Sequence, residues 1–189
     1  MHQAGQIPAA EGIYRQVLQV DPQNAHAWCY LGSACHDQDR WDEAVAAYRQ
    51  AIRFQPHFPV AYNNLGNTLR MQRRLQEALQ CFDQALQQKP DYVNAIKNKG
   101  TALTWEGHLD EALAAYRQAL ELAPEEAETH TNIGVIQLLR GDFDEGWDEY
   151  AWRWKTKETS LPEHNPVSYT HLTLPTNIIR WRSRGAAGE

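Results

Sequence analysis

The sequence predicts an all-α fold, a right-handed α-α superhelix of antiparallel helix pairs, on three observations. First, apolar side chains recur three and four residues apart along two consecutive helices, most clearly between residues 61 and 90. Second, this pair of helices returns every 34 residues, and the glycine of the first helix marks the period at Gly32, Gly66, Gly100 and Gly134. Third, each pair has apolar inner faces that it cannot bury alone, so successive pairs must stack on one another.

Three other positions recur with the same period. The second helix carries a small residue at Ala10, Ala44, Ala78, Ala112 and Gly146. Four residues later comes an aromatic residue at Tyr14, Tyr48, Phe82, Tyr116 and Tyr150. A proline closes the unit at Pro22, Pro56, Pro90 and Pro124. The glycine and the small residue are expected to let the two helices approach closely. The large side chains expected to be buried between the pairs are Trp28, Leu31, Tyr48, Leu65, Phe82, Leu103, Tyr116 and Ile133.

A 34-residue period with an aromatic residue, Leu, Gly, Ala, an aromatic residue, Ala and Pro in this order resembles the tetratricopeptide repeat (TPR). The resemblance extends from the start of the chain to about Lys157 and implies a TPR solenoid. It divides the chain into a partial repeat at 1–24 in which only the second helix is complete, repeats at 25–58, 59–92 and 93–126, a Trp-rich last repeat at 127–157, and a linker with a non-native tail at 158–189.

The helix boundaries follow from the period and from the turn residues. The expected helices are Ile7–Val20, Ala25–Gln38, Trp41–Phe54, Pro59–Gln72, Leu75–Gln88, Val93–Glu106, Leu109–Leu122, Ala127–Arg140 and Asp142–Lys155. Asp21 and Pro22 are expected to provide the N-cap and the first-turn proline of the helix that begins near Ala25. Because the helix before Gly5 is incomplete, the chain is expected to begin within a repeat, as a fragment would.

The second helix of the last repeat departs from the pattern. Trp147, Tyr150, Trp152 and Trp154 cover more than one face, so this helix is either a C-terminal cap or a surface that packs on something beyond the repeats. The run from Gly141 to Trp154 resembles the last repeat of bacterial proteins in which TPRs precede a glycosyltransferase domain. That resemblance implies a missing C-terminal domain that packs on Trp147, Trp152 and Trp154.

The residues after this helix read differently. Thr159–Pro166 has the composition of a turn-rich linker. Val167–Thr176 resembles the translation of a sequencing-library adapter, and the alternative is a true strand, since polar and apolar side chains partly alternate there. If the adapter is the origin, Asn177–Glu189 has no biological meaning.

Composition and motifs exclude several classes of function. The chain has 42% hydrophobic residues and a net charge of −6, so no general attraction to nucleic acid or an anionic membrane is expected. No apolar run approaches the ~20 residues of a membrane-spanning helix, and no signal peptide is recognisable, which makes the cytoplasm the default location. The three cysteines lack metal-ligand spacing and are expected to be packing residues: Cys29, Cys35 and Cys81. No catalytic motif is present, so we predict no enzyme activity for these residues, no metal and no cofactor.

Binding is the expected activity. Two residues before each glycine stand Tyr30, Asn64, Asn98 and Asn132. The three amides would form a ladder along a concave groove lined by the first helices, where they suit the main chain of an extended peptide. They resemble the asparagine ladder of the protein O-GlcNAc transferases. Flanking polar residues complete the expected peptide-binding groove: Asn63, Asn67, Arg70, Lys97 and Thr101.

One alternative stays open for the asparagines of this groove. The asparagines could hydrogen-bond only to neighbouring turns. The chaperone-binding carboxylate clamp is not expected, because Cys29 and Ser33 stand where its first Lys and Asn would be. The sequence therefore predicts a peptide-binding scaffold, the substrate- or partner-recruiting arm of a larger bacterial glycosyltransferase, and the alternative is a structural assembly module without a peptide groove.

Overall fold

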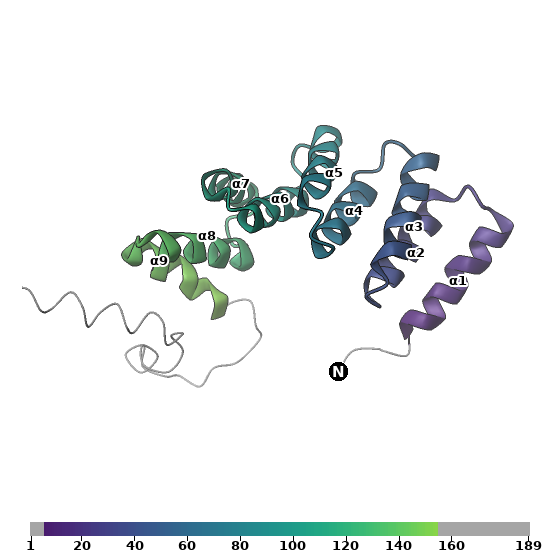
Figure 1. Cartoon of the computed structure of the whole chain (residues 1–189), viewed down its shortest axis with the longest axis horizontal. Coiled ribbons are helices and arrows are strands. Elements are labelled where there is room, and N and C mark those ends of the chain that lie inside the picture. Colours follow the sequence, from purple (N-terminus) through teal and green to yellow (C-terminus); the bar gives the residue numbers. More distant parts are fainter. Residues whose placement is uncertain (1–5, 155–189) are drawn as a thin grey trace, which may run out of the picture. The chain divides into compact units, whose positions relative to one another are not determined.

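The structure is a computed structural model that describes residues 6–154, with side chains from Ala10 onward. These residues form nine α-helices and one short 3-10 helix, with no strand among them (Figure 1). In order they are α1 (Gln6–Val20), α2 (Ala25–His36), α3 (Trp41–Phe54), α4 (Pro59–Met71), α5 (Leu75–Gln88), α6 (Val93–Glu106), α7 (Leu109–Leu122), α8 (Ala127–Arg140), α9 (Phe143–Tyr150) and η1 (Ala151–Trp154). The expectations for Thr159–Pro166, Val167–Thr176 and Asn177–Glu189 concern residues outside this range.

The helices pack in the order in which they occur in the chain. Pairs are formed by α2 with α3, α4 with α5, α6 with α7 and α8 with α9, and each second helix also contacts the first helix of the next pair. The first helices touch as well, α2 with α4 and α4 with α6. Figure 1 shows these pairs following one another from α1, in purple, to α9, in green. The predicted all-α solenoid of paired helices is confirmed.

The turns within the repeats share one backbone conformation. Gly107 and Gly141 end α6 and α8 with φ of 87° and 90°, in the left-handed region where glycine is favoured. Asp39 and Arg73 occupy the corresponding turns with φ of 57° and 63°. A side chain in this region carries a conformational cost, so these two turns are held by the packing of the helices on either side.

The start of α2 corrects one prediction. The N-cap is Asn24, whose Oδ1 accepts a hydrogen bond from the backbone N–H of Ala27 at 2.9 Å. Asp21 instead accepts from the backbone N–H of Gln23 and from the Asn24 amide, both at 3.2 Å. The reason is distance along the chain: Asn24 directly precedes the first helical residue, whereas Asp21 and Pro22 lie in the turn before it.

The end of the last repeat corrects another. A single helix was expected from Asp142 to Lys155, but α9 ends at Tyr150 and the chain tightens into η1. The tighter turn leaves Trp152 stacked on His130 of α8, with ring centroids 3.9 Å apart and an interplanar angle of 12°. This aromatic contact ties η1 to α8 and accounts for the change of helix type. Lys155 lies outside the described residues.

The core follows the periodic positions. Of the eight side chains expected to be buried, Trp28 alone is only partly buried, because its indole N–H reaches the edge of the fold and donates to the carbonyl of Pro22. The first three periodic glycines make room for the aromatic ring of the partner helix more than for its backbone. A Cβ on Gly66 would lie 2.7 Å from a ring carbon of Phe82, and Gly32 and Gly100 face Tyr48 and Tyr116 in the same way.

The buried side chains form two separate hydrophobic clusters. The first extends from Leu18 in α1 to Ala102 in α6. The second begins at Leu103 in α6 and extends to Ile136 in α8. Leu79 is partly buried and packs against both. The core therefore divides within the third full repeat and is not one continuous cluster.

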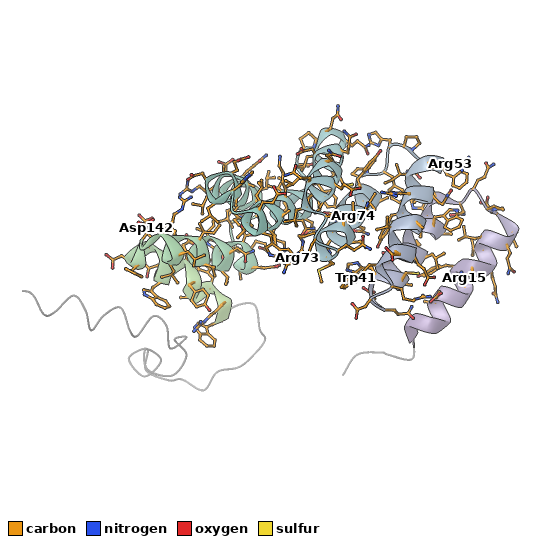
Figure 2. All side chains as sticks on the ribbon, viewed as in Figure 1. Arg15, Trp41, Arg53, Arg73, Arg74 and Asp142 are labelled. Atoms are coloured by element: carbon orange, nitrogen blue, oxygen red, sulfur yellow. The ribbon has the colours of Figure 1, made fainter. Side chains whose placement is uncertain are left out.

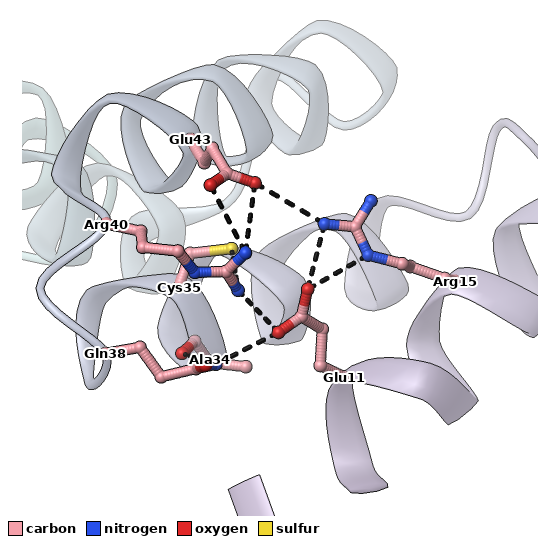
Figure 3. A network of polar contacts seen from close by, with 7 residues as sticks. All are labelled: Glu11, Arg15, Ala34, Cys35, Gln38, Arg40 and Glu43. Carbon is pink, nitrogen blue, oxygen red and sulfur yellow. Dashed lines mark hydrogen bonds and ion pairs between the residues drawn. The ribbon is translucent and has the colours of Figure 1, made fainter. Parts of the chain in front are cut away.

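A polar network, drawn in Figure 3, joins α1 to the first full repeat. Glu11 of α1 accepts hydrogen bonds from Arg15 at 2.8 Å, from Gln38 at 3.0 Å and from Arg40 at 2.5 Å. Arg40 also donates to Glu43 at the start of α3. The hydrogen bonds from Gln38, Arg15 and Arg40 hold the pKa of Glu11 below its usual value, although burial acts against them.

Candidate functional site

The first helices of the repeats carry every residue of the expected groove. Four of them lie on α4, namely Asn63, Asn64, Asn67 and Arg70. The other four lie on the next two first helices: α6 carries Lys97, Asn98 and Thr101, and α8 carries Asn132. Because α4 contacts α6 directly, these two helices bring most of the set together. The side chain of Asn132 forms no hydrogen bond with any residue that the structure describes.

The asparagines of α4 and α6 are joined to one another. Asn98 donates from Nδ2 to Oδ1 of Asn63 at 2.9 Å, and Asn63 donates from Nδ2 to Oδ1 of Asn64 at 3.1 Å. Asn63 is buried, with 6% of its surface exposed. Two members of the expected ladder are thus connected through Asn63, which has a structural part in holding α4 against α6. Asn64 keeps its amide N–H groups for another acceptor, and Asn98 keeps its amide oxygen for another donor.

A small pocket opens between α2 and α4, with a volume of about 150 Å³. Polar side chains dominate its lining: Ser33, His36, Asp37, Tyr48, Asn64 and Asn67. Ser33 and the Tyr48 hydroxyl lie 3.1 Å apart, and Nδ1 of His36 lies 2.9 Å from the hydroxyl of Thr68. Burial raises the pKa of Tyr48 far above its ordinary value, so the phenol stays neutral and can donate. The pocket offers both donors and acceptors to a polar main chain.

Lys97 does not provide a free positive charge. Its ammonium lies 2.6 Å from Glu128 and 3.2 Å from Glu126, both at the start of α8. Burial alone would lower the pKa of Lys97, but the hydrogen bond and charge of Glu128, together with Glu126, raise it. This triad joins α6 to the start of α8, where Glu126 is the N-cap and accepts from the backbone N–H of Thr129 at 2.7 Å.

Thr101 is also engaged within the repeat. Its hydroxyl donates to the carbonyl of Lys97 at 3.2 Å and accepts from the hydroxyl of Tyr116 at 3.2 Å. Thr101 therefore helps to orient the buried ring of Tyr116, and its side chain has less capacity for a ligand than its place in the sequence suggests.

A cationic and aromatic cluster lies where α4 ends beside α6. Arg70 donates to Oδ1 of Asn67 at 2.6 Å, and its guanidinium carbon lies 4.7 Å from the ring centroid of Trp105. Arg73, labelled in Figure 2, lies 4.3 Å from the same ring. Burial lowers the pKa of Arg70, while Tyr116 and Glu128 act in the opposite direction. Sequence reasoning did not assign Arg73 and Trp105 to the groove, because neither residue type recurs at its place in the other repeats. The pocket residues His36 and Asp37 were left out of the groove for the same reason.

The Trp-rich end has two exposed indoles, Trp147 and Trp154, and one stacked indole, Trp152. Trp147 is 41% exposed, although its counterparts one and three repeats earlier, Leu113 and Val45, are buried. Trp152 is half-buried against His130, whose Nδ1 lies 2.5 Å from a carboxylate oxygen of Glu149 and whose Nε2 lies 2.8 Å from the carbonyl of Pro124. Trp152 is thus part of the last repeat as well as of the predicted docking surface.

The three cysteines lie in the core or at its edge. Cys29 and Cys35 are buried and Cys81 is half-buried, as expected for packing residues. Burial raises the pKa of Cys29 and of Cys81 to about 11, so neither thiol is activated. Between residues 6 and 154, no helix combines the length and apolarity needed to cross a membrane.

Family comparisons agree with the period of the sequence. A family described as "TPR repeat" matches residues 32–72 and 100–141, and one described as "Tetratricopeptide repeat" matches residues 59–92, which together are more than half of the chain. The chain belongs to the tetratricopeptide-repeat family. No curated protein matches this TPR chain.

Several solved structures share the fold. A crystal structure of MamA is 22% identical to this chain, with a TM-score of 0.71. The alignment covers 80% of this chain and 88% of the MamA chain. YrrB, described as a TPR protein with an unusual peptide-binding site, is 22% identical over 84% of this chain and 80% of its own, with a TM-score of 0.65. The first TPR of Spaghetti (RPAP3), bound to an HSP90 peptide, is 24% identical over 64% and 96%, with a TM-score of 0.61. At these identities the likeness establishes a TPR scaffold and nothing finer.

Proposed function

We propose that this TPR chain is a scaffold that binds an extended peptide along the first helices of its repeats. The observation that carries the proposal is the polar pocket between α2 and α4, two of whose lining residues are the predicted groove residues Asn64 and Asn67. Peptide binding in the related folds of YrrB and RPAP3 supports the same reading. A TPR scaffold is typically not catalytic, and no catalytic residue is proposed here.

Main-chain recognition is the proposed mechanism. Asn64, Asn98 and Asn132 would each exchange hydrogen bonds with the peptide backbone, which explains how such a groove could accept many sequences. Each such bond contributes a net ~0.5–1.5 kcal/mol. Asn63 would act indirectly, since it holds Asn64 and Asn98 in place through the hydrogen bonds described above.

We also propose a wider setting for this scaffold: the recruiting arm of a larger bacterial glycosyltransferase that works in the cytoplasm. The resemblance of residues 141–154 to the last repeat of such proteins supports it, together with the exposed indole of Trp147. In this proposal a C-terminal domain would pack on Trp147, Trp152 and Trp154.

The groove is tested by a triple variant, Asn64→Ala with Asn98→Ala and Asn132→Ala. A matched control replaces three amides of the second helices that share the 34-residue period, Gln50, Gln84 and Gln118, by Ala. Binding to a library of synthetic decapeptides and thermal unfolding are measured on the same preparations. We expect the asparagine variant to lose at least tenfold in affinity, with a moderate fall in Tm because the buried Asn63 loses both of its amide partners. The glutamine variant should bind as the parent does.

Other outcomes would contradict the proposal. Unchanged peptide binding in the asparagine variant would reject the groove. If only the glutamine variant loses binding, the structural assembly module is favoured, because its contacts would lie on the second helices. A large fall in Tm of the asparagine variant would show that these amides serve mainly to hold neighbouring repeats together.

A further inference from the structure

Two guanidinium groups meet at one indole at the junction of the second and third full repeats. Arg70 lies in the last turn of α4, Arg73 in the turn that follows, and Trp105 near the end of α6. The two guanidinium carbons lie 4.7 Å and 4.3 Å from the centroid of the indole, within the range of cation–π contact. Trp105 is 39% exposed, so this cluster is accessible from solvent. We call these three side chains the arginine clasp.

The positive charges of the clasp have no carboxylate in contact. Among the described residues, no Asp or Glu lies within 4.0 Å of either guanidinium, whereas Arg40, Arg74 and Arg140 each have such a partner. The hydrogen-bond partner of Arg70 is the neutral amide of Asn67. Its Nε is buried without a partner. Burial of one cation beside a second cation is unfavourable, because no anion neutralises their charges.

Both arginines are held in position before any ligand arrives. Asn67 fixes the guanidinium of Arg70 at 2.6 Å, and the indole orients both side chains. The backbone of Arg73 is in the left-handed conformation of a tight turn, with φ of 63°. Less rotamer freedom is therefore lost when these groups bind an anion.

The clasp adjoins the pocket through one residue. Asn67 lines the pocket between α2 and α4 and also accepts the hydrogen bond from Arg70. A peptide whose main chain lies in the pocket would pass Asn67 on its way toward α6. One of its side chains would then lie beside Arg70 and Arg73.

We propose that Arg70, Arg73 and Trp105 form a subsite for one carboxylate side chain, Asp or Glu, of a peptide bound in the groove. This inference rests on the proposed peptide-binding function and adds a preference to it. Guanidinium groups bind carboxylates through paired N–H···O bonds, and the carboxylate supplies the missing countercharge. A carboxylate fits better than a dianionic phosphate, because Asp37 in the adjoining pocket and Glu128, whose charge acts on Arg70, already make the surroundings negative.

The test is a double-mutant cycle between protein and peptide. Decapeptides selected from a random synthetic library are measured with Glu, Gln and phosphoserine at each acidic position. The protein forms are the parent, Arg70→Gln with Arg73→Gln, and a control of the same charge change on second helices, Arg53→Gln with Arg117→Gln. We expect one position at which Glu→Gln lowers the affinity of the parent and of the control about tenfold. In the Arg70/Arg73 variant the same change should alter affinity less than twofold, while the Gln peptide still binds.

Each other result overturns something specific. If the parent binds no peptide, the groove and the subsite both fail. If peptides bind without an acidic preference, or if the preference survives in the Arg70/Arg73 variant, the groove stands and the subsite is wrong. Tighter binding of phosphoserine than of Glu would reject the carboxylate assignment. Should the double variant prove unstable, Arg73→Gln alone, at an exposed turn, gives the same comparison with an expected loss of at least threefold in the preference for Glu.

Discussion

The α4–α5 pair and the α8–α9 pair occupy equivalent places in two repeats, yet different contacts hold them. In the first, Gly66 faces the ring of Phe82, which is completely buried. In the last, a Cβ on Gly134 would lie 2.4 Å from the backbone nitrogen of Tyr150, whose side chain is only half-buried. The same glycine makes room for a ring in the one and for a helix backbone in the other. Glycine therefore occurs at the same position in both repeats, but the neighbouring helices determine which atoms it contacts.

The next helix explains most of this difference. In the inner repeats, the second helix is covered by the first helix of the following pair, which buries Val45 and Leu113. The corresponding Trp147 of α9 is exposed. In place of that cover, η1 turns back onto α8, and an aromatic stack with a His–Glu contact replaces apolar burial. The three predictions below test this contrast, from the largest expected effect to the smallest.

Truncation of the periodic aromatic should cost far more in the inner repeat. Phe82→Ala is expected to lower the free energy of unfolding by ~3–5 kcal/mol, because it removes a ring with no exposed surface and leaves a cavity. Tyr150→Ala should cost about 1 kcal/mol, since its ring is half-exposed and the site can relax. Urea unfolding followed by circular dichroism measures both. Equal losses would show that the last repeat is packed as firmly as the inner ones.

Removal of the histidine contact should loosen only the end of the array. His130→Ala deletes the contacts to Glu149 and to the Pro124 carbonyl together with the stack on Trp152, and we expect a local loss of ~1–2 kcal/mol. Hydrogen exchange should become faster in residues 143–154 and stay unchanged in residues 59–88. His108→Ala, at an exposed turn, is the control. Faster exchange throughout the protein would mean that the last pair supports the whole fold.

The docking of α1 should weaken in acid by a small amount. The pKa of Glu11 is lowered in the folded protein, so its contribution is present above the pKa of the unfolded chain and is lost as the pH falls through the folded value. Glu11→Gln should therefore reduce stability at pH 7 by ~0.5–1 kcal/mol, a modest figure because Arg15 and Arg40 are partly exposed. The difference from the parent should shrink as the pH falls below about 4. A difference that does not vary with pH in paired urea titrations would contradict this account.

Much of the fold could be predicted because the 34-residue period constrains many residues at once. The bounds of α3, α5, α6, α7 and α8 agree with those expected from the sequence. The N-cap at Asn24 and the early end of α9 were missed, since both depend on single local contacts that no period reveals. In general, local hydrogen-bond competition decides boundaries to within a residue or two.

The groove was harder to anticipate than the fold. The period placed Asn64 and Asn98 on adjacent first helices, but it could not show that Asn63 joins them or that the ammonium of Lys97 is paired with Glu126 and Glu128. The partner of a polar side chain depends on its rotamer and on the next repeat, which periodicity does not encode. The peptide-binding roles of the groove residues therefore stay predictions, and the arginine clasp emerges only from the three-dimensional arrangement.

The division of the core inside α6 bears on how such a chain can change over generations. Phe82 packs in the first hydrophobic cluster and Tyr116 in the second, with Leu79 as a shared neighbour. Substitutions that do not contact Leu79 should have effects in one cluster that add to those in the other, because distant sites without common partners act independently. Variation can then accumulate on the two sides of α6 almost separately.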